Sequence, residues 1–188
     1  IQAAGFASAQ WEFEEKVEQL IGTPEKDNFL NNWYANHVRK IDIDSLASWG
    51  FNAIRLPMHY NLFTLSIQEE PVAGQNTWLS KGFEMTDSLV SWCKQNNMYV
   101  ILDLHAAPGG QGGNTGISDY NPAYPSLWES IENKNKTFSL WRKIASLVNR
   151  FVFSHQFIRK VIITVKTIHI EMTPIQKNMV SIFLTNFT

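Results

Sequence analysis

The chain has 188 residues, a formal net charge of -1, 44% hydrophobic residues and seven Trp. This composition is typical of a globular protein, and the near-neutral charge excludes a strongly basic surface, so neither nucleic acid nor an acidic membrane is an expected partner. The single cysteine, Cys93, cannot form an internal disulfide bond. No stretch is apolar enough to predict a membrane-spanning helix.

The composition changes near residue 145. Residues 1–145 contain 11 Lys and Arg against 16 Asp and Glu, whereas residues 146–188 contain five basic residues and one acidic residue. The later segment also has no Gly, Ala, Asp, Trp, Tyr or Cys. Its Ile, Val, Phe and Thr favour strands, but it offers few turn residues. We therefore predict one unit over 1–145 and an atypical tail over 146–188, either mistranslated or diverged.

The first half of the chain predicts helix, strand and loop in that order. Residues 1–20 are predicted as helix or loop, with no convincing strand. A helix is predicted over 42–50, and a β-favouring strand follows directly over 51–57, with Arg55 on one of its faces. Residues 58–79 are polar and irregular, and a segment of this length is typical of a functional loop.

The same order repeats further along. An amphipathic helix is predicted over 83–97 and a second strand over 98–105. The loop over 106–126 is too rich in Gly and Pro to predict either helix or strand. A third helix is predicted over 137–148. This alternation predicts an α/β fold with a parallel sheet and crossover helices.

Polar residues at the ends of the two predicted strands are the first candidates for a site. Arg55 belongs to one strand, and Asp103 and His105 belong to the other; the carboxyl ends of parallel strands are where α/β folds place their sites. An Arg and an Asp on adjacent strands are expected to neutralise one another, because an unpaired buried charge is costly. Whether that pair contacts a ligand or is only a buried ion pair stays open, whereas His105 is favoured as a site residue.

Other residues support a site less specifically. His59 follows the first predicted strand, where it either contacts a ligand or is a loop histidine without a role. Tyr120 and Trp128 fall in or beside the long loop, where their rings either stack on sugars or pack the loop down. The five histidines are scattered, so no metal site is predicted. The loop glycines match no phosphate-binding spacing, and no cofactor is expected.

Four segments in order resemble glycoside hydrolase family 5, the cellulase and β-glucanase family. They are GFNAIRLPMHYN at 50–61, YVILDLHAAPGGQGG at 99–113, SDYNPAYPSLWES at 118–130 and LWRKIA at 140–145. The resemblance implies a (β/α)8 barrel, of which this chain holds about strands 2 and 3 with their helices. It also implies that Arg55 supports the catalytic nucleophile and that His105 lines the sugar subsite.

The family's catalytic glutamates are not found by the same matching. Retaining hydrolysis needs two carboxyl groups about 5 Å apart. The resemblance implies an acid/base glutamate in an Asn-Glu-Pro motif, but the family pattern stops near residue 145, and no Asn-Glu dipeptide occurs in the chain. Glu171, at the end of a strand-like stretch over 161–171, is the one candidate for a diverged acid/base. A complete barrel also needs about 250 residues.

The resemblance therefore indicates a fragment of a β-glucan-hydrolysing enzyme, inactive alone, whose partner is a β-glucan or oligosaccharide. The alternative is a non-catalytic carbohydrate-binding remnant. Family members act outside the cell, so secretion is expected, although the chain begins at Ile1 and shows no signal peptide. The sequence predicts no oligomeric state.

Overall fold

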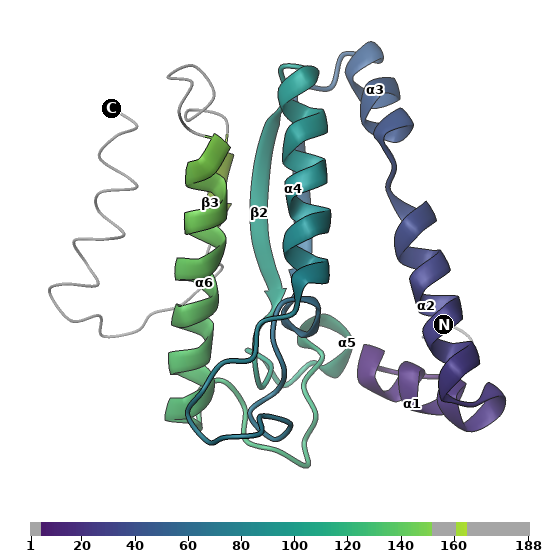
Figure 1. The fold of residues 1–188 in the computed structure, drawn as a ribbon. Helices are drawn as coiled ribbons and strands as arrows, with labels where there is room; N and C mark the ends of the chain where they lie inside the picture. The colour runs from purple at the N-terminus through teal and green to yellow at the C-terminus, as the bar shows by residue number, and fades with distance from the viewer. Residues whose placement is uncertain (1–4, 152–160, 165–188) are drawn as a thin grey trace, which may run out of the picture.

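The computed structural model describes residues 5–151 and 161–164 (Figure 1). Its elements in chain order are α1 (Gln10–Ile21), α2 (Thr23–His37), α3 (Lys40–Ser48), β1 (Ala53–His59), the 3-10 turn η2 (Tyr60–Leu62), α4 (Ser80–Gln95), β2 (Tyr99–Ala106), α5 (Thr115–Ser118), α6 (Ile131–Phe151) and β3 (Val161–Thr164). No helix in these two ranges is long and apolar enough to cross a membrane.

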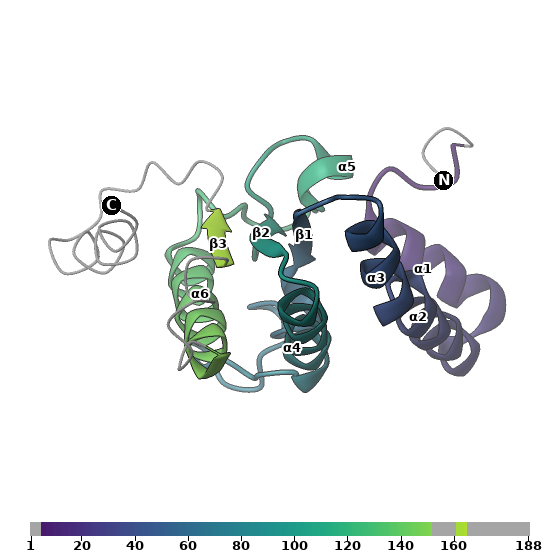
Figure 2. The same ribbon diagram turned by 90° about the horizontal axis from the view of Figure 1, so that it is seen from above.

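The strands form a parallel sheet in the order β1, β2, β3. Arg55 lies opposite Ile101, and the register shifts between Met58 and His59. Figure 2 shows α4 and α6 on one face of the sheet and α5 on the other side of the strands. Helices on one side of a parallel sheet and polar strand residues on the other are the layers of a (β/α)8 barrel, with the open face corresponding to its interior.

The apolar core lies between the sheet and the helices. Val100 and Leu102 of β2 are fully buried, because alternate residues of a strand point to the same face. They belong to one cluster with side chains of α4 and α6, among them Leu89, Val90, Cys93, Leu140 and Ile144. This packing fixes β2, and with it the opposite face on which Asp103 and His105 lie.

The predicted elements are present, but several begin elsewhere. Helix α3 starts at Lys40, because Asp42 lies inside its first turn and accepts a hydrogen bond from the Arg39 amide at 2.8 Å. Helix α6 starts at Ile131, ahead of the predicted 137, because the Ser130 hydroxyl accepts from the Asn133 amide at 3.1 Å.

The loop predicted over 106–126 contains a helical turn, so that part of the prediction was wrong. Ala106 still belongs to β2, and α5 occupies Thr115–Ser118. The Asn114 side chain accepts from the Gly116 amide and caps this turn. A capping residue can therefore form one turn even within a run of Gly.

Strand β1 runs through Pro57 and ends at His59, two residues beyond the predicted end. Among the described strands β1 pairs only with β2, so it is an edge strand of the described sheet. Proline has no amide hydrogen to donate, and an edge strand tolerates it because one side of the strand has no partner that needs this hydrogen bond. His59 is consequently a strand residue and not a loop residue.

The chain before residue 40 forms two helices. Helix α1 confirms the helical alternative for residues 10–20 of the first predicted segment, whereas α2 was not predicted. Gly22 with φ of 81° and Pro24 in the first turn of α2 give the start signal that could have revealed it.

Part of the predicted tail is ordered with the sheet. Helix α6 continues to Phe151, and β3 pairs in parallel with residues 100–103 of β2. Strand β3 is the beginning of the strand-like stretch over 161–171. Glu171 at the end of that stretch lies outside the described residues.

Candidate functional site

Arg55, Asp103 and His105 meet on the open face of the sheet. Asp103 Oδ2 accepts a hydrogen bond from Arg55 Nη2 and lies 3.1 Å from His105 Nδ1. Arg55 Nη2 and His105 Nδ1 are 3.2 Å apart. The sequence predicted that Arg55 and Asp103 pair across adjacent strands, and the structure brings both together with His105 in one cluster.

Burial within the cluster is uneven. The Asp103 side chain is 1% exposed, whereas those of Arg55 and His105 are 46% and 35% exposed. A buried carboxylate thus contacts two partly exposed side chains, which is the arrangement that fixes the direction of a guanidinium or imidazole toward a ligand. If His105 donates from Nδ1 to Asp103, its Nε2 is the acceptor presented to a ligand hydroxyl.

The second oxygen of Asp103, Oδ1, is buried and has no hydrogen-bond partner among the described residues. Buried carboxylate oxygens are normally satisfied by protein or water. Asp103 therefore keeps one buried acceptor that none of the described residues satisfies.

Gln111 fixes the start of the loop after β2. Its side-chain oxygen accepts from the Ala107 amide at 3.0 Å, its Nε2 donates to the His105 carbonyl, and its own carbonyl accepts from Trp128 Nε1 at 2.7 Å. Trp128 is 39% exposed, so its indole is held by one edge while part of the ring remains open. Sequence reasoning found Trp128 but missed Gln111, which carries no charge or motif.

The loop glycines serve close packing. Gly109 and Gly110 adopt φ of 81° and 73°. A Cβ on Gly110 would lie 2.8 Å from Tyr120 Cα, and one on Gly109 would lie 2.2 Å from Asn133 Nδ2. Tyr120 is therefore held against the loop by its backbone and is half-buried.

His59 is engaged by the same loop. Its Nε2 lies 2.8 Å from Asp119 Oδ2, and its Nδ1 accepts from the Asn61 amide, so the hydrogen is assigned to Nε2. Asp119 Oδ1 also accepts from the amides of Gln10 and Trp11 at 2.7 and 3.0 Å. Burial acts to raise the pKa of Asp119, but His59 and the two amides outweigh it and hold the pKa below its ordinary value. One carboxylate thus joins β1, the loop after β2 and the start of α1.

A buried ion pair fixes the loop after β1. The side chains of Lys136 on α6 and Glu70 in the loop are 3% and 2% exposed and form a salt bridge. Lys136 Nζ also donates to Thr64 at 3.2 Å, and Glu70 accepts from the amide and hydroxyl of Thr77. Burial acts to raise the pKa of Glu70, but Lys136 and Thr77 lower it overall.

Within the described part of the chain, no three His, Cys, Asp or Glu side chains gather closely enough to hold a metal ion. What the geometry provides instead is a set of hydrogen-bond donors and acceptors beside partly open aromatic rings. Such a set is suited to a neutral, hydroxyl-rich ligand.

The family model for cellulase (glycosyl hydrolase family 5) matches residues 12–150. The chain therefore belongs to glycosyl hydrolase family 5, as its four matching segments implied. The match includes both strands that carry the Arg55–Asp103–His105 cluster.

Curated relatives extend the same result. A β-xylosidase of Phanerodontia chrysosporium is 25% identical over 141 residues, covering 75% of this chain and 28% of that protein. A glucan 1,3-β-glucosidase of Blumeria graminis is 30% identical over 131 residues, covering 70% of this chain and 28% of that protein. The chain thus spans less than a third of the length of these relatives.

A solved structure has the same fold. The rutinosidase from Aspergillus niger aligns with a TM-score of 0.55 at 19% identity, covering 97% of this chain and 50% of that one. At this identity the comparison concerns the fold alone. The fold of this chain is accordingly part of a (β/α)8 barrel.

Proposed function

We propose that the chain is the N-terminal part of a retaining glycoside hydrolase that cleaves β-linked glucans and acts outside the cell. The observation that carries the proposal is the buried Asp103 carboxylate holding Arg55 and His105 on the open face of a parallel sheet. The relatives named as glucan 1,3-β-glucosidases support a glucan substrate, and secretion follows because a polymeric substrate cannot enter the cell.

In this proposal each residue of the cluster has a separate part. Arg55 orients the nucleophilic carboxylate of the complete barrel, because a fixed guanidinium favours the ionised form of a nearby carboxyl group. His105 binds a sugar hydroxyl, and Asp103 is a positioning residue for both. Both catalytic glutamates would lie outside this chain, so the 188-residue chain alone should not turn over substrate.

The first experiment measures reducing sugar released from soluble β-1,3- and β-1,4-glucans by the purified 188-residue chain. We expect no release above that of a heat-treated sample. Glu15→Gln is the control, because Glu15 is exposed. Turnover that is lost in Glu171→Gln and retained in Glu15→Gln would overturn the fragment proposal. It would also overturn the proposal that the catalytic glutamates lie outside this chain. Binding of oligosaccharides without turnover would instead favour a non-catalytic carbohydrate-binding role.

The second experiment examines the coding DNA after codon 145. A reading frame that continues to an Asn-Glu-Pro motif would supply the missing acid/base. The extended protein should hydrolyse β-glucan, and Arg55→Ala in it should lower kcat/KM by about a hundredfold or more. Activity unaffected by Arg55→Ala would contradict the role given to this side chain.

A further inference from the structure

A pocket outside the Arg55–Asp103–His105 cluster lies between α1, α2 and the loop that contains α5. Its volume is about 340 Å³, within the about 300–1,000 Å³ range of small-molecule sites. Aromatic side chains from α1 and α2 form much of its wall: Phe13, Phe29, Trp33 and Tyr34. Nothing in the proposed hydrolysis uses these residues.

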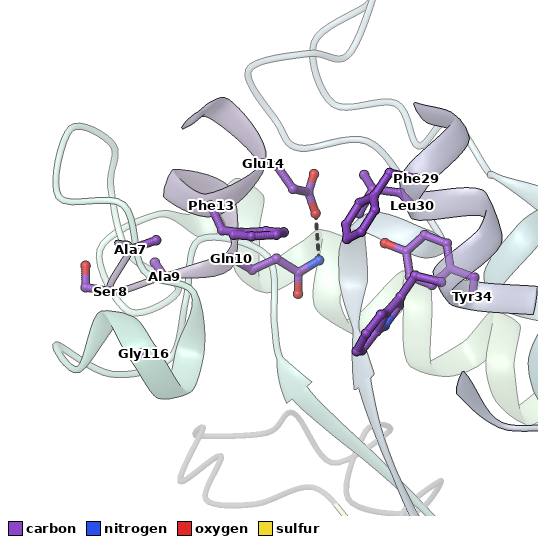
Figure 3. A pocket seen from close by; sticks show the side chains of 11 residues that line it. Ala7, Ser8, Ala9, Gln10, Phe13, Glu14, Phe29, Leu30, Tyr34 and Gly116 are labelled. Atoms are coloured by element: carbon purple, nitrogen blue, oxygen red, sulfur yellow. Dashed lines mark hydrogen bonds between the residues drawn. The ribbon is translucent and has the colours of Figure 1, made fainter. Parts of the chain in front are cut away.

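The pocket combines ring faces with polar groups. Figure 3 shows Gln10 and Glu14 of α1 facing Phe29 and Tyr34 of α2 across it. Gln10 Nε2 donates to Glu14 Oε1 at 2.7 Å, which leaves the Gln10 carbonyl oxygen and the second Glu14 oxygen as acceptors. Burial and the charge of Glu14 raise the pKa of Tyr34 to about 12, so its hydroxyl stays protonated as a donor.

Trp33 provides the exposed platform. Its ring stacks on His37 with centroids 4.8 Å apart and an interplanar angle of 20°, and the residue is 52% exposed. One face of the indole is therefore supported by the imidazole, and about half of the residue remains exposed. A pyranose ring has one apolar face that stacks on such an indole, and its equatorial hydroxyls suit acceptors at the side.

The charge of the pocket selects among ligand classes. Its lining includes Glu14 and no Lys or Arg, and Lys81 lies over the ring of Tyr34 with Nζ 4.3 Å from the ring centre, so the opposite charges at the pocket nearly balance and a neutral ligand fits best. The loop after β2 also borders the pocket: Gly116 lines it, and Asp119 in that loop binds both His59 of β1 and the first amides of α1.

We propose that this α1–α2 pocket is a second carbohydrate-binding site that takes a β-linked glucosyl unit remote from the bond to be cleaved. The proposal rests on the proposed β-glucan substrate. Trp33 stacks on the sugar ring, Tyr34 donates to a hydroxyl, and Gln10 and Glu14 accept from hydroxyls.

The experiment measures binding of laminaritriose and cellotriose to the 188-residue chain by isothermal titration calorimetry, after circular dichroism and a cooperative thermal transition have established folding. Trp33→Ala should weaken binding about tenfold or more, and Tyr34→Phe, which removes one hydroxyl only, about threefold to tenfold. Trp49→Ala is the matched control, because Trp49 is 72% exposed at the end of α3 and away from the pocket. It should leave the affinity unchanged.

The outcomes separate this pocket from the proposed active site. Binding lost in Trp33→Ala but kept in Arg55→Ala supports the pocket, even if the extended enzyme proves inactive on glucans. Binding lost only in Arg55→Ala, no binding by a chain that unfolds cooperatively, or a chain with no cooperative transition overturns it. Two other results would also overturn it, because the pocket would then serve another ligand. One is concentration-dependent self-association that Trp33→Ala abolishes, without sugar binding. The other is preferential binding of tetramethylammonium.

Discussion

Replacing Lys136 with Met should strongly destabilise the chain. The change removes the cation from a pair in which both side chains are almost fully buried, 3% and 2% exposed, and leaves the Glu70 carboxylate without a compensating charge. Breaking a buried pair in this way costs about 3–5 kcal/mol. Glu70 keeps its hydrogen bonds from the Thr77 amide and hydroxyl, so we place the loss near the lower end, at about 3 kcal/mol.

Urea unfolding followed by Trp fluorescence measures this loss. The double variant Lys136→Met with Glu70→Gln removes the isolated charge and should recover at least half of it, because the amide oxygen of Gln can still accept from Thr77. Lys40→Met is the control: Lys40 pairs with Asp44 while 48% exposed, and an exposed pair contributes about 0–1 kcal/mol. A loss in Lys136→Met no larger than that of Lys40→Met would refute the view that this pair fixes the loop after β1.

Two further predictions concern the loop after β2. Gly110→Ala should lower the free energy of unfolding by about 2–4 kcal/mol, because φ is 73° and the new Cβ would lie 2.8 Å from Tyr120 Cα. Gly113→Ala is the control and should change thermal unfolding little, because a Cβ there would have nothing within 4 Å. Equal shifts in the two variants would contradict the packing role of Gly110. Stability should also fall in acid. The folded-state pKa values of Asp119 and Glu70 are lowered, so their stabilisation is fully present above their unfolded values, about 4, and is lost as the pH falls through the lower folded values. Asp119→Asn should make the dependence of the unfolding free energy on pH between 6 and 2 shallower, and an unchanged slope would show that this carboxylate is not among its causes.

The cluster was predictable because two simple rules suffice for it. Alternation along a strand places Asp103 and His105 on one face, and parallel pairing brings Arg55 to the same edge. These inferences need only local sequence and the direction of the chain.

The other contacts could not be predicted in this way. Asp119 binds amides of Gln10 and Trp11 that lie more than 100 residues earlier, and Lys136 meets Glu70 across 66 positions. In the sequence each of these charged residues has many possible partners, so only the folded structure identifies the actual one. The α1–α2 pocket was not predicted for a related reason, because α2 itself was not predicted from the sequence.

The pairing of β1 with β2 also makes the cluster sensitive to how the strands align. Arg55 lies opposite Ile101, two positions before its partner Asp103 on the same face. Sliding β1 by a single residue would turn the guanidinium toward the apolar helices and bring Ile54 or Leu56 to the open face. Asp103 and His105, two apart on one strand, would keep their mutual geometry through such a slip. The Arg55–Asp103 contact therefore forms only when the two strands are correctly aligned. A misaligned sheet would lose this contact, so the charge pair favours the correct alignment during folding.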